Sequence, residues 1–398
     1  MKALFAHDHR FYQSEAGMLS KNAFDAQVWE RYLKHIDELI VMARVFELPA
    51  GAKSENYGVS SCDHVTFQHT PESHRWTNLL PKNKAQQAMD AQVATVDAVI
   101  ARLPSRIGTM AVRAAKRRGK PYFIEVVGDP VESYKHHGSI ILKLFAKHAG
   151  RMMKKNVASA SHVIYVTNRD LQEKYPTNAE HTAASNVEIH DIPENMLEMR
   201  AAQIAMNHNR PKKIGMIATL ETDYKGIDTA IEALQILKNK QQDAQLYILG
   251  PGDKTRWEEL AQQHNVADRI VFCGILPAGQ AVLNWLDELD LYIQPSRTEG
   301  VPRALIEAMA RGCPAIGSVA GGIPELLSSE YTHEIANPHE LAKKLSDLIQ
   351  TPEKRQQQSQ DNIKIAAQYA KPILEKRRAE LFTSFFKTVD SKGRKSKL

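Results

Sequence analysis

Cysteine is scarce in this sequence. Three residues, Cys62, Cys273 and Cys313, are spread over 398 positions, and no two of them form a CxxC pair. Secreted disulfide-rich proteins and zinc-binding modules usually place cysteines in close pairs, so this spacing argues against both classes. Free thiols in a reducing compartment fit the pattern better, and we expect a cytoplasmic protein.

Long apolar segments are also absent. No run approaches the roughly 18 to 20 residues that a membrane-spanning helix needs. The first residues, MKALFAHDHRF, contain too short an apolar core for a signal peptide and predict a first strand instead. With 43% hydrophobic and 25% charged residues, the composition is that of an ordinary globular protein. A chain of 398 residues is too long for one hydrophobic core, which predicts two domains.

Acidic residues are missing from two stretches of the first half, residues 98–124 and 133–169, whereas lysine and arginine recur through both. The net charge is +6 and the pI about 9.0. Nucleic acid, an anionic membrane surface or an anionic substrate could each account for a basic half. Residues 139–156 have helical apolar spacing with lysines between, which suits either a half-buried helix with a solvated face or a helix bound at a membrane surface. No nucleic-acid-binding motif accompanies the charge, so we expect no nucleic acid partner.

Short β-like runs alternate with longer helical patterns, which predicts parallel βαβ architecture. In the first half we expect strands at 2–6, 39–44, 121–127 and 162–167, and helices at 24–36, 83–103, 107–119 and 140–156. The alternation breaks near 195–211 and then restarts. We therefore predict domains at 1–200 and 201–370, followed by a C-terminal helix and a disordered basic tail at 371–398. Ligands of such domains bind outside the carboxyl ends of the strands.

Three strand ends in the second half carry residues suited to ligand binding. Lys225 and Gly226 precede a helix, where backbone N–H groups could bind a diphosphate, although a solvated surface lysine is the simpler interpretation. Gly250 and Gly274 each end a strand and allow either close ligand approach or a turn. Each feature is weak by itself.

A fourth strand end is more specific. The segment SRTEGVPRALIEAMARGCP, residues 296–314, places Glu299 and Glu307 eight residues apart around a helix start at Pro302. The pair Ser296 and Glu299 also matches a capping box, which would explain Glu299 without a function. Capping does not explain Glu307, because a carboxylate among the apolar residues of this helix needs a partner.

The segment EGVPRALIE resembles the E-x7-E motif of retaining glycosyltransferases with the GT-B fold, in the large family 4, or group 1. The similarity continues through EAMARGCPAIGSVAGGIPELL and covers residues 214–327 in order. The resemblance implies an α/β protein of two Rossmann-like domains that face each other across a cleft, with a helical C-terminus packing back on the first domain. It implies an acceptor-binding first domain and a donor-binding second domain.

The same resemblance implies a retaining transferase that moves a sugar from a nucleotide-sugar donor to a glycan or lipid-linked acceptor, in surface polysaccharide or glycolipid biosynthesis. No cofactor and no metal are expected, since the sequence has no D-x-D after a strand. Glu299 would contact the donor sugar near the reacting carbon, and Glu307 the ribose hydroxyls. The other residues placed at the donor are Lys225 and the backbone of Gly300 and Val301 at the diphosphate, and Gly250 and Gly274 where the ligand approaches main chain.

Two departures from the family pattern bear on this assignment. Ala218 and Thr219 stand where the family usually has Gly-Arg, so one cation for the diphosphate is missing and Lys225 carries more of that task. Thr219 is still expected at the donor. Gly128 and Asp129 stand where a first-domain histidine often meets the donor sugar. We expect Asp129 to be the catalytic residue from the first domain, with His136 and His137 as alternatives.

Other interpretations of the sequence stay open. A GT-B-fold sugar-nucleotide epimerase and a non-catalytic subunit are the rival functions, and the anionic membrane surface is a second partner of the basic first half, at the inner face of the cell membrane. His7, Asp8 and His9 suggest a metal site, but adjacent residues on a strand point in different directions. Gly17 matches a glycine-rich turn of the family only weakly.

Overall fold

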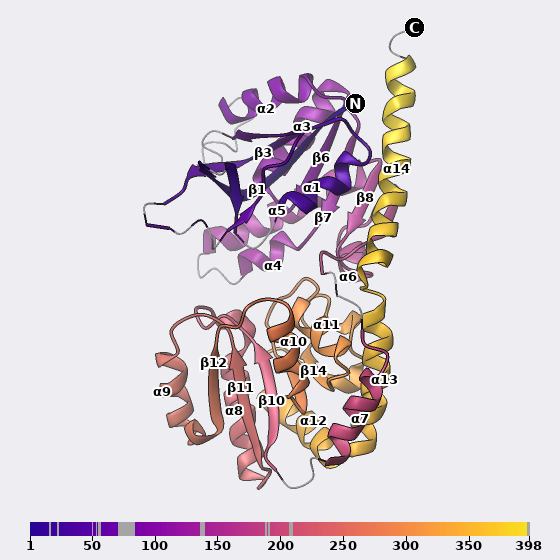
Figure 1. The fold of residues 1–398 in the computed structure, drawn as a ribbon. Coiled ribbons are helices and arrows are strands. Elements are labelled where there is room, and N and C mark those ends of the chain that lie inside the picture. Colours follow the sequence, from indigo (N-terminus) through magenta and orange to yellow (C-terminus); the bar gives the residue numbers. More distant parts are fainter. Residues whose placement is uncertain are drawn as a thin grey trace. The chain divides into compact units, whose positions relative to one another are not determined.

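The computed structural model describes residues 1–398 except 16, 22–23, 50, 53, 55–56, 71–83, 136–139, 188, 190–191, 207–209 and 396–398. The chain forms two compact units. The first consists of Met1–Val166, Leu171–Ala184 and Glu375–Leu398, and the second of Thr167–Asp170 and Ser185–Leu374. Each unit contains a mainly parallel sheet with helices on both faces (Figure 1).

The sheet of the first unit has the parallel order β5-β3-β1-β6-β7-β8-β9, and the short strands β2 and β4 join it along the second half of β1 in antiparallel pairing. Strand order reverses beside β1, where ligand sites of such sheets are found. Its strands are β1 (Lys2–Ser14), β2 (Gly17–Ser20), β3 (Glu38–Glu47), β4 (Gly58–Val59), β5 (Val65–His69), β6 (Ala98–Leu103), β7 (Tyr122–Val126), β8 (His162–Tyr165) and β9 (Glu180–Ala183).

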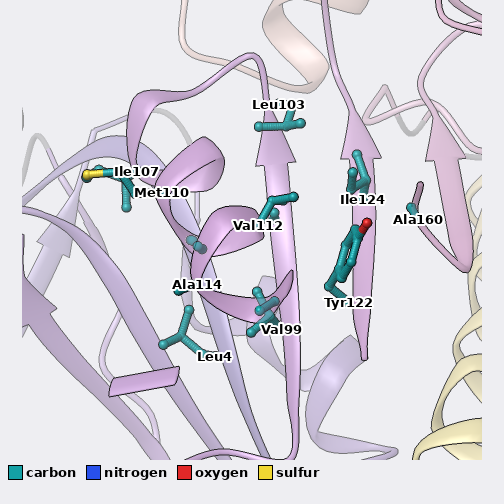
Figure 2. Packing of buried hydrophobic residues seen from close by; sticks show 14 of the residues in the cluster. Leu4, Val99, Leu103, Ile107, Met110, Val112, Ala114, Tyr122, Ile124 and Ala160 are labelled. Atoms are coloured by element: carbon teal, nitrogen blue, oxygen red, sulfur yellow. The ribbon is translucent and has the colours of Figure 1, made fainter. Parts of the chain in front are cut away.

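Helices cover both faces of this sheet. Apolar residues of α2, α3 and α5 cover one face, as Figure 2 shows for α3 against β6 and β7. An aromatic cluster fills the other face, where the Phe382 ring centroid lies 5.2 Å from that of Tyr32 and 5.0 Å from that of Phe123. The helices are α1 (Ala26–Leu33), α2 (Lys84–Ala94), α3 (Arg106–Arg118), α4 (Pro130–Lys135), α5 (Ile140–Ala158), α6 (Asp170–Lys174) and α14 (Lys371–Lys395).

The C-terminal helix α14 packs on the first unit, as predicted, because Phe382 and Phe385 are buried in its aromatic core. Two local predictions were wrong. The helix expected over 83–103 ends at Ala94, and β6 follows, because a strand buried on both faces is a continuous apolar run that periodicity cannot distinguish from a helix. The basic tail expected to be disordered is helical up to Lys395.

The second unit has a six-stranded, fully parallel sheet in the order β12-β11-β10-β13-β14-β15. Its strands are β10 (Lys212–Ile217), β11 (Ala244–Leu249), β12 (Ile270–Gly274), β13 (Leu291–Gln294), β14 (Ala315–Ser318) and β15 (Thr332–His333). Its helices are α7 (Met196–Met206), α8 (Ile227–Asn239), α9 (Thr255–Gln263), α10 (Gln280–Asp287), α11 (Arg303–Ala310), α12 (Pro338–Gln350) and α13 (Pro352–Ala367), with a 3-10 turn, η3 (Asp223–Lys225). The order reverses between β10 and β13, so the carboxyl ends of these two strands form the switch point of a Rossmann-type sheet.

The predicted alternation of strands and helices in the second unit is confirmed from β10 to β14. Helix α7 was not predicted, because it lies in the stretch interpreted as a polar break. All three cysteines are free thiols, as expected. Within the described residues, we find no helix whose length and apolarity would let it cross a bilayer.

Candidate active site

A cavity of about 760 Å³ lies in the second unit, at the carboxyl ends of β10 and β13. Most of the residues that the sequence assigned to the donor line this cavity. They are Thr219, Lys225, Gly250, Glu299, Val301 and Glu307. Gly300 and Gly274 are not among the lining residues, although their neighbours Val301 and Ile275 are. The structure thus brings together residues that lie far apart in the sequence.

Glycines let the loops around the cavity pack backbone against backbone. A Cβ on Gly226 would lie 2.1 Å from the carbonyl oxygen of Pro295, and one on Gly321 would lie 1.9 Å from that of Glu299. Both glycines also have positive φ, 72° and 52°, which disfavours any other residue. The loop after β10 and the loop after β14 are therefore fixed against the loop that carries Glu299.

Close backbone packing also requires glycine at position 250. With φ at 154°, its position would place a Cβ 2.0 Å from the carbonyl oxygen of Ala218. A side chain at 250 would push apart the ends of β10 and β11, and with them Thr219. Close backbone packing therefore accounts for this glycine even without a ligand.

The carboxylate of Glu299 is held by three donors, all on the same oxygen. Oε1 accepts from Lys225 Nζ at 2.6 Å, from Ser296 Oγ at 2.7 Å and from Gln294 Nε2 at 2.9 Å. No hydrogen bond from a described residue reaches Oε2. Because Glu299 lines the cavity, the second oxygen is available to accept a hydrogen bond from a bound molecule.

The support under Glu299 is buried. Ser296 and Gln294 are 0% and 2% exposed, and Tyr292 donates from its hydroxyl to Gln294 Oε1 at 2.8 Å. Gln294 was not predicted from the sequence. A glutamine at the end of an otherwise apolar strand, LYIQP, was the signal that could have revealed it.

The capping-box interpretation of Ser296 and Glu299 is wrong. Helix α11 begins at Arg303 with Pro302 at its N-cap, and no side chain caps it. The Ser296 hydroxyl donates to the Glu299 carboxylate instead of accepting from a helix N–H. The Ser296–Glu299 spacing thus serves the cavity and not the helix start.

Arg297 holds the 3-10 turn that carries Lys225, a contact that the sequence did not reveal. Arg297 Nη1 donates to the carbonyl of Asp223 at 2.6 Å, and its backbone N–H donates to that of Tyr224 at 2.7 Å. The Arg297 guanidinium also pairs with Asp228 on α8. These bonds fix η3, and with it Lys225, against the loop that carries Glu299.

Glu307 lies on α11 and pairs with Arg303 one turn earlier, Nε to Oε1 at 3.1 Å. This is the partner that a carboxylate on a largely apolar helix requires. The Glu307 side chain is 23% exposed and lines the cavity, so it remains accessible to a ligand. Glu299 and Glu307 therefore both face the same cavity.

Asp129 follows β7 in the first unit and lies outside this cavity. Its Oδ1 accepts from the Val131 N–H at 2.8 Å and the Tyr175 hydroxyl at 2.5 Å, and Oδ2 lies 3.5 Å from Lys174 Nζ. These bonds give Asp129 a structural role at the start of α4. His136 and His137, the alternatives to Asp129, lie outside the described residues.

The metal interpretation of His7, Asp8 and His9 finds no support in the described residues, among which no three His, Cys, Asp or Glu side chains are grouped as ligands. Asp8 accepts from the backbone N–H of Arg106 and of Ile107 at 2.8 and 2.9 Å. Burial, with the nearby Arg102 charge, lowers the pKa of His7 to about 3 and that of His9 to about 4.

Comparison with known proteins agrees with this geometry. The family model described as glycosyl transferases group 1 matches residues 201–365. Protein CapJ of Staphylococcus aureus is 30% identical over 392 residues, which cover 98% of this chain and 97% of CapJ. The chain belongs to the group 1 glycosyl transferases. A second relative, the amylovoran biosynthesis glycosyltransferase AmsK of Erwinia amylovora, is 36% identical over 135 residues, 32% of this chain and 33% of AmsK.

Solved structures extend the likeness to the whole fold of this group 1 glycosyl transferase. Anabaena HepE in complex with UDP superposes with a TM-score of 0.66 at 17% identity, covering 96% of this chain and all of HepE. HepE in complex with UDP-glucose gives a TM-score of 0.62 over the same shares at 17% identity. The fold is GT-B, as the sequence resemblance predicted.

Proposed function

We propose that this protein transfers a sugar from a nucleoside diphosphate sugar to a hydroxyl of a glycan or lipid-linked acceptor, with retention of anomeric configuration and without a metal or cofactor. The observation that carries the proposal is the Lys225–Glu299 pair in a cavity that Glu307 also lines. A synthetic role in surface polysaccharide or glycolipid draws support from the relative named for amylovoran biosynthesis. The HepE complexes with UDP and UDP-glucose support the donor class.

The diphosphate of the donor would meet Lys225 and the backbone N–H groups of Gly300 and Val301. As the bond between the anomeric carbon and the diphosphate oxygen breaks, its electron pair leaves with the diphosphate, which gains charge. Fixed positive groups at that point stabilise the transition state more than the ground state. The acceptor hydroxyl attacks from the side of the leaving group, and its proton passes to the departing phosphate oxygen.

The two glutamates would hold the donor at its two sugars. Glu299 Oε2 accepts a hydrogen bond from a hydroxyl of the transferred sugar, and Glu307 accepts from the ribose hydroxyls. Thr219 and Gly250 contact the part of the donor that lies between its two sugars. Gly274 lets the base approach main chain at the end of β12. Asp129 remains the proposed catalytic contribution of the first unit.

The donor and the stereochemistry can be tested without knowing the acceptor. Thermal shifts with UDP, UDP-glucose, UDP-N-acetylglucosamine and GDP-mannose should identify a donor, because a bound ligand raises the melting temperature by mass action. Slow hydrolysis of that donor, with water as the acceptor, should release the α-sugar first when followed by proton NMR. First release of the β-anomer would contradict retention, and a converted but intact nucleotide sugar would favour an epimerase. Hydrolysis unchanged by EDTA is expected for a metal-independent enzyme.

The basic surface of the first unit supports a second proposal, binding to the anionic inner face of the cell membrane from the cytoplasm. Helices α3 and α5 lie side by side through Arg113 and Met152, at 3.4 Å, and through Lys116 and Asn156, at 3.3 Å. Both helices carry exposed cations, and each Lys or Arg that meets an anionic surface would contribute about 1 kcal/mol. The cations are Lys116, Arg117, Arg118, Arg151, Lys154 and Lys155.

We expect the protein to sediment with phosphatidylglycerol vesicles at low salt and to be released at high salt, because the Debye length shortens. Vesicles of phosphatidylcholine alone should not bind. Replacing Lys154 and Lys155 by glutamate should weaken binding by more than about 10-fold. Binding that is indifferent to lipid charge would count against this proposal.

A further inference from the structure

One face of the first-unit sheet is apolar where α2 and α3 cover it, and charged and aromatic past the start of α3. Along β1 the face that carries Leu4 and Ala6 is buried under α2 and α3. Helix α3 begins level with Asp8, whose carboxylate accepts its first N–H groups. Beyond this point the strands β1 and β3 continue, and the same face carries charged and aromatic side chains. These are Asp8, Arg10 and Tyr12 on β1, and Arg44 and Phe46 on β3.

Two arginines of this face are paired across the strands. Arg10 is the register partner of Arg44, after an irregularity in β1 that follows Ala6. Like charges opposite each other in a sheet are unfavourable unless an anion lies between them. Irregularities of this kind are frequent where a strand re-aims a side chain beside a site.

The charges of the arginines are only partly balanced. Arg44 Nη2 lies 3.5 Å from Asp8 Oδ2, but the buried Nε of Arg44 has no hydrogen-bond partner among the described residues. Arg10 is exposed and has no ion pair within the described part of the chain. The positive end of α3 adds to the same field. Two guanidinium groups and a helix N-terminus thus face one carboxylate, which favours an added anion.

Aromatic rings lie next to the arginines. The Phe46 side chain is 43% exposed, its ring centroid lies 6.3 Å from that of Tyr12, and the Arg10 guanidinium lies 5.9 Å from it. Tyr57 is 5.3 Å from Tyr12 and extends the patch. Exposed aromatic rings pack against the C–H face of a sugar ring, and polar groups beside the rings form hydrogen bonds with the sugar hydroxyls.

We propose that Arg10, Arg44, Tyr12 and Phe46 form a subsite for a negatively charged sugar of the acceptor. This inference rests on the proposed glycosyltransferase function and names its acceptor class. The oxyanion of the sugar would accept from the partly exposed guanidinium of Arg44 and from Arg10, and its ring would pack on Tyr12 and Phe46. The subsite lies at the carboxyl end of β1, beside the switch point of the first-unit sheet, where ligands of such folds bind.

The test uses the full-length chain and sugars of defined charge. Trigalacturonate offers carboxylates, mannose 6-phosphate offers a phosphate, and maltotriose is the neutral control. Titration calorimetry should show binding of an acidic sugar and none of maltotriose. Whether the carboxylate or the phosphate binds identifies the anion. Binding of neither acidic sugar, or equal binding of maltotriose, would overturn the inference.

Variants locate the site. Arg10→Met and Arg44→Met should each weaken binding of the acidic sugar by about 10-fold or more, since hydrogen bonds to a charged group are lost. Lys376→Met removes an exposed cation of the first unit, on α14, and should leave the binding of the acidic sugar unchanged. Asp8→Asn keeps one of the two oxygens that accept from the α3 N–H groups, removes the competing charge and should tighten binding. A gain in affinity cannot arise from misfolding and would support the proposal. An Asp8→Asn variant with the native melting temperature and unchanged or weaker affinity would contradict it.

UDP binding separates this inference from the proposed function. All four variants should bind UDP as the native chain does, because the changes lie in the first unit and the donor cavity in the second. If UDP binds and acidic sugars do not, the acceptor inference fails alone. If neither UDP nor any nucleotide sugar binds, the proposed function fails.

Discussion

Glu299→Gln should lower the rate of sugar transfer by about 10³-fold, the scale of losing one pre-positioned charge or donor at a transition state. Glutamine keeps the shape and one acceptor oxygen for Lys225 and Ser296, so the local structure should persist. It removes the negative charge that would face the developing positive charge at the anomeric carbon. Rates of donor hydrolysis, measured as UDP release, report the loss directly.

The same variant should bind UDP with unchanged affinity, because UDP lacks the sugar that Glu299 contacts. A matched control is available in the same unit, where Glu288 pairs with Lys213 at 3.1 Å away from the cavity. Glu288→Gln should leave hydrolysis and UDP binding unchanged. Activity retained in Glu299→Gln would remove the central assignment, and lost UDP binding would move Glu299 from the sugar to the nucleotide.

The second unit was predictable because local rules decide most of it. Its strands are short apolar runs separated by helices of regular period. Glycines stand where the backbones of the loops after β10, β11 and β14 meet another backbone, at Gly226, Gly250 and Gly321. The glutamates of the E-x7-E motif fall on one βα loop and the helix that follows it. Their convergence on one cavity with Lys225 required only that β10 and β13 be neighbours, which the Rossmann-type order provides.

The supporting contacts were not predictable in the same way. Arg297 acts through partners on another loop and on α8, and no periodicity or motif identifies such long-range pairs. Gln294 contacts residues close to it in the sequence, but its support of Glu299 depends on burial that the sequence does not show. The first unit was harder still, since β6 is buried on both faces and the strands β2, β4 and β5 are short or exposed. The extension of β1 and β3 beyond α3, which carries the proposed acceptor subsite, depends on a register irregularity that the sequence does not reveal.

Lys225→Met should reduce donor hydrolysis by about 10²-fold or more, because the departing diphosphate would lose its one fixed side-chain cation from the motif. Unlike Glu299→Gln, it should also weaken UDP binding by about 10-fold, since a charge-assisted hydrogen bond to the diphosphate is lost. Lys225→Arg should restore part of both losses by keeping the charge. The two effects together place Lys225 at the diphosphate and Glu299 at the sugar.

Lys213→Met is the matched control for Lys225→Met. Lys213 pairs with a glutamate and lies 5.6 Å from the Tyr247 ring, much as Lys225 pairs with Glu299 and lies 5.1 Å from the Tyr224 ring. Any general cost of removing a lysine with such contacts should appear equally in both melting temperatures. The double variant Lys225→Met/Glu299→Gln should lose less than the product of the single losses, because the residues act as one unit. Strictly multiplicative losses would show that the pair seen at 2.6 Å has no joint role in transfer.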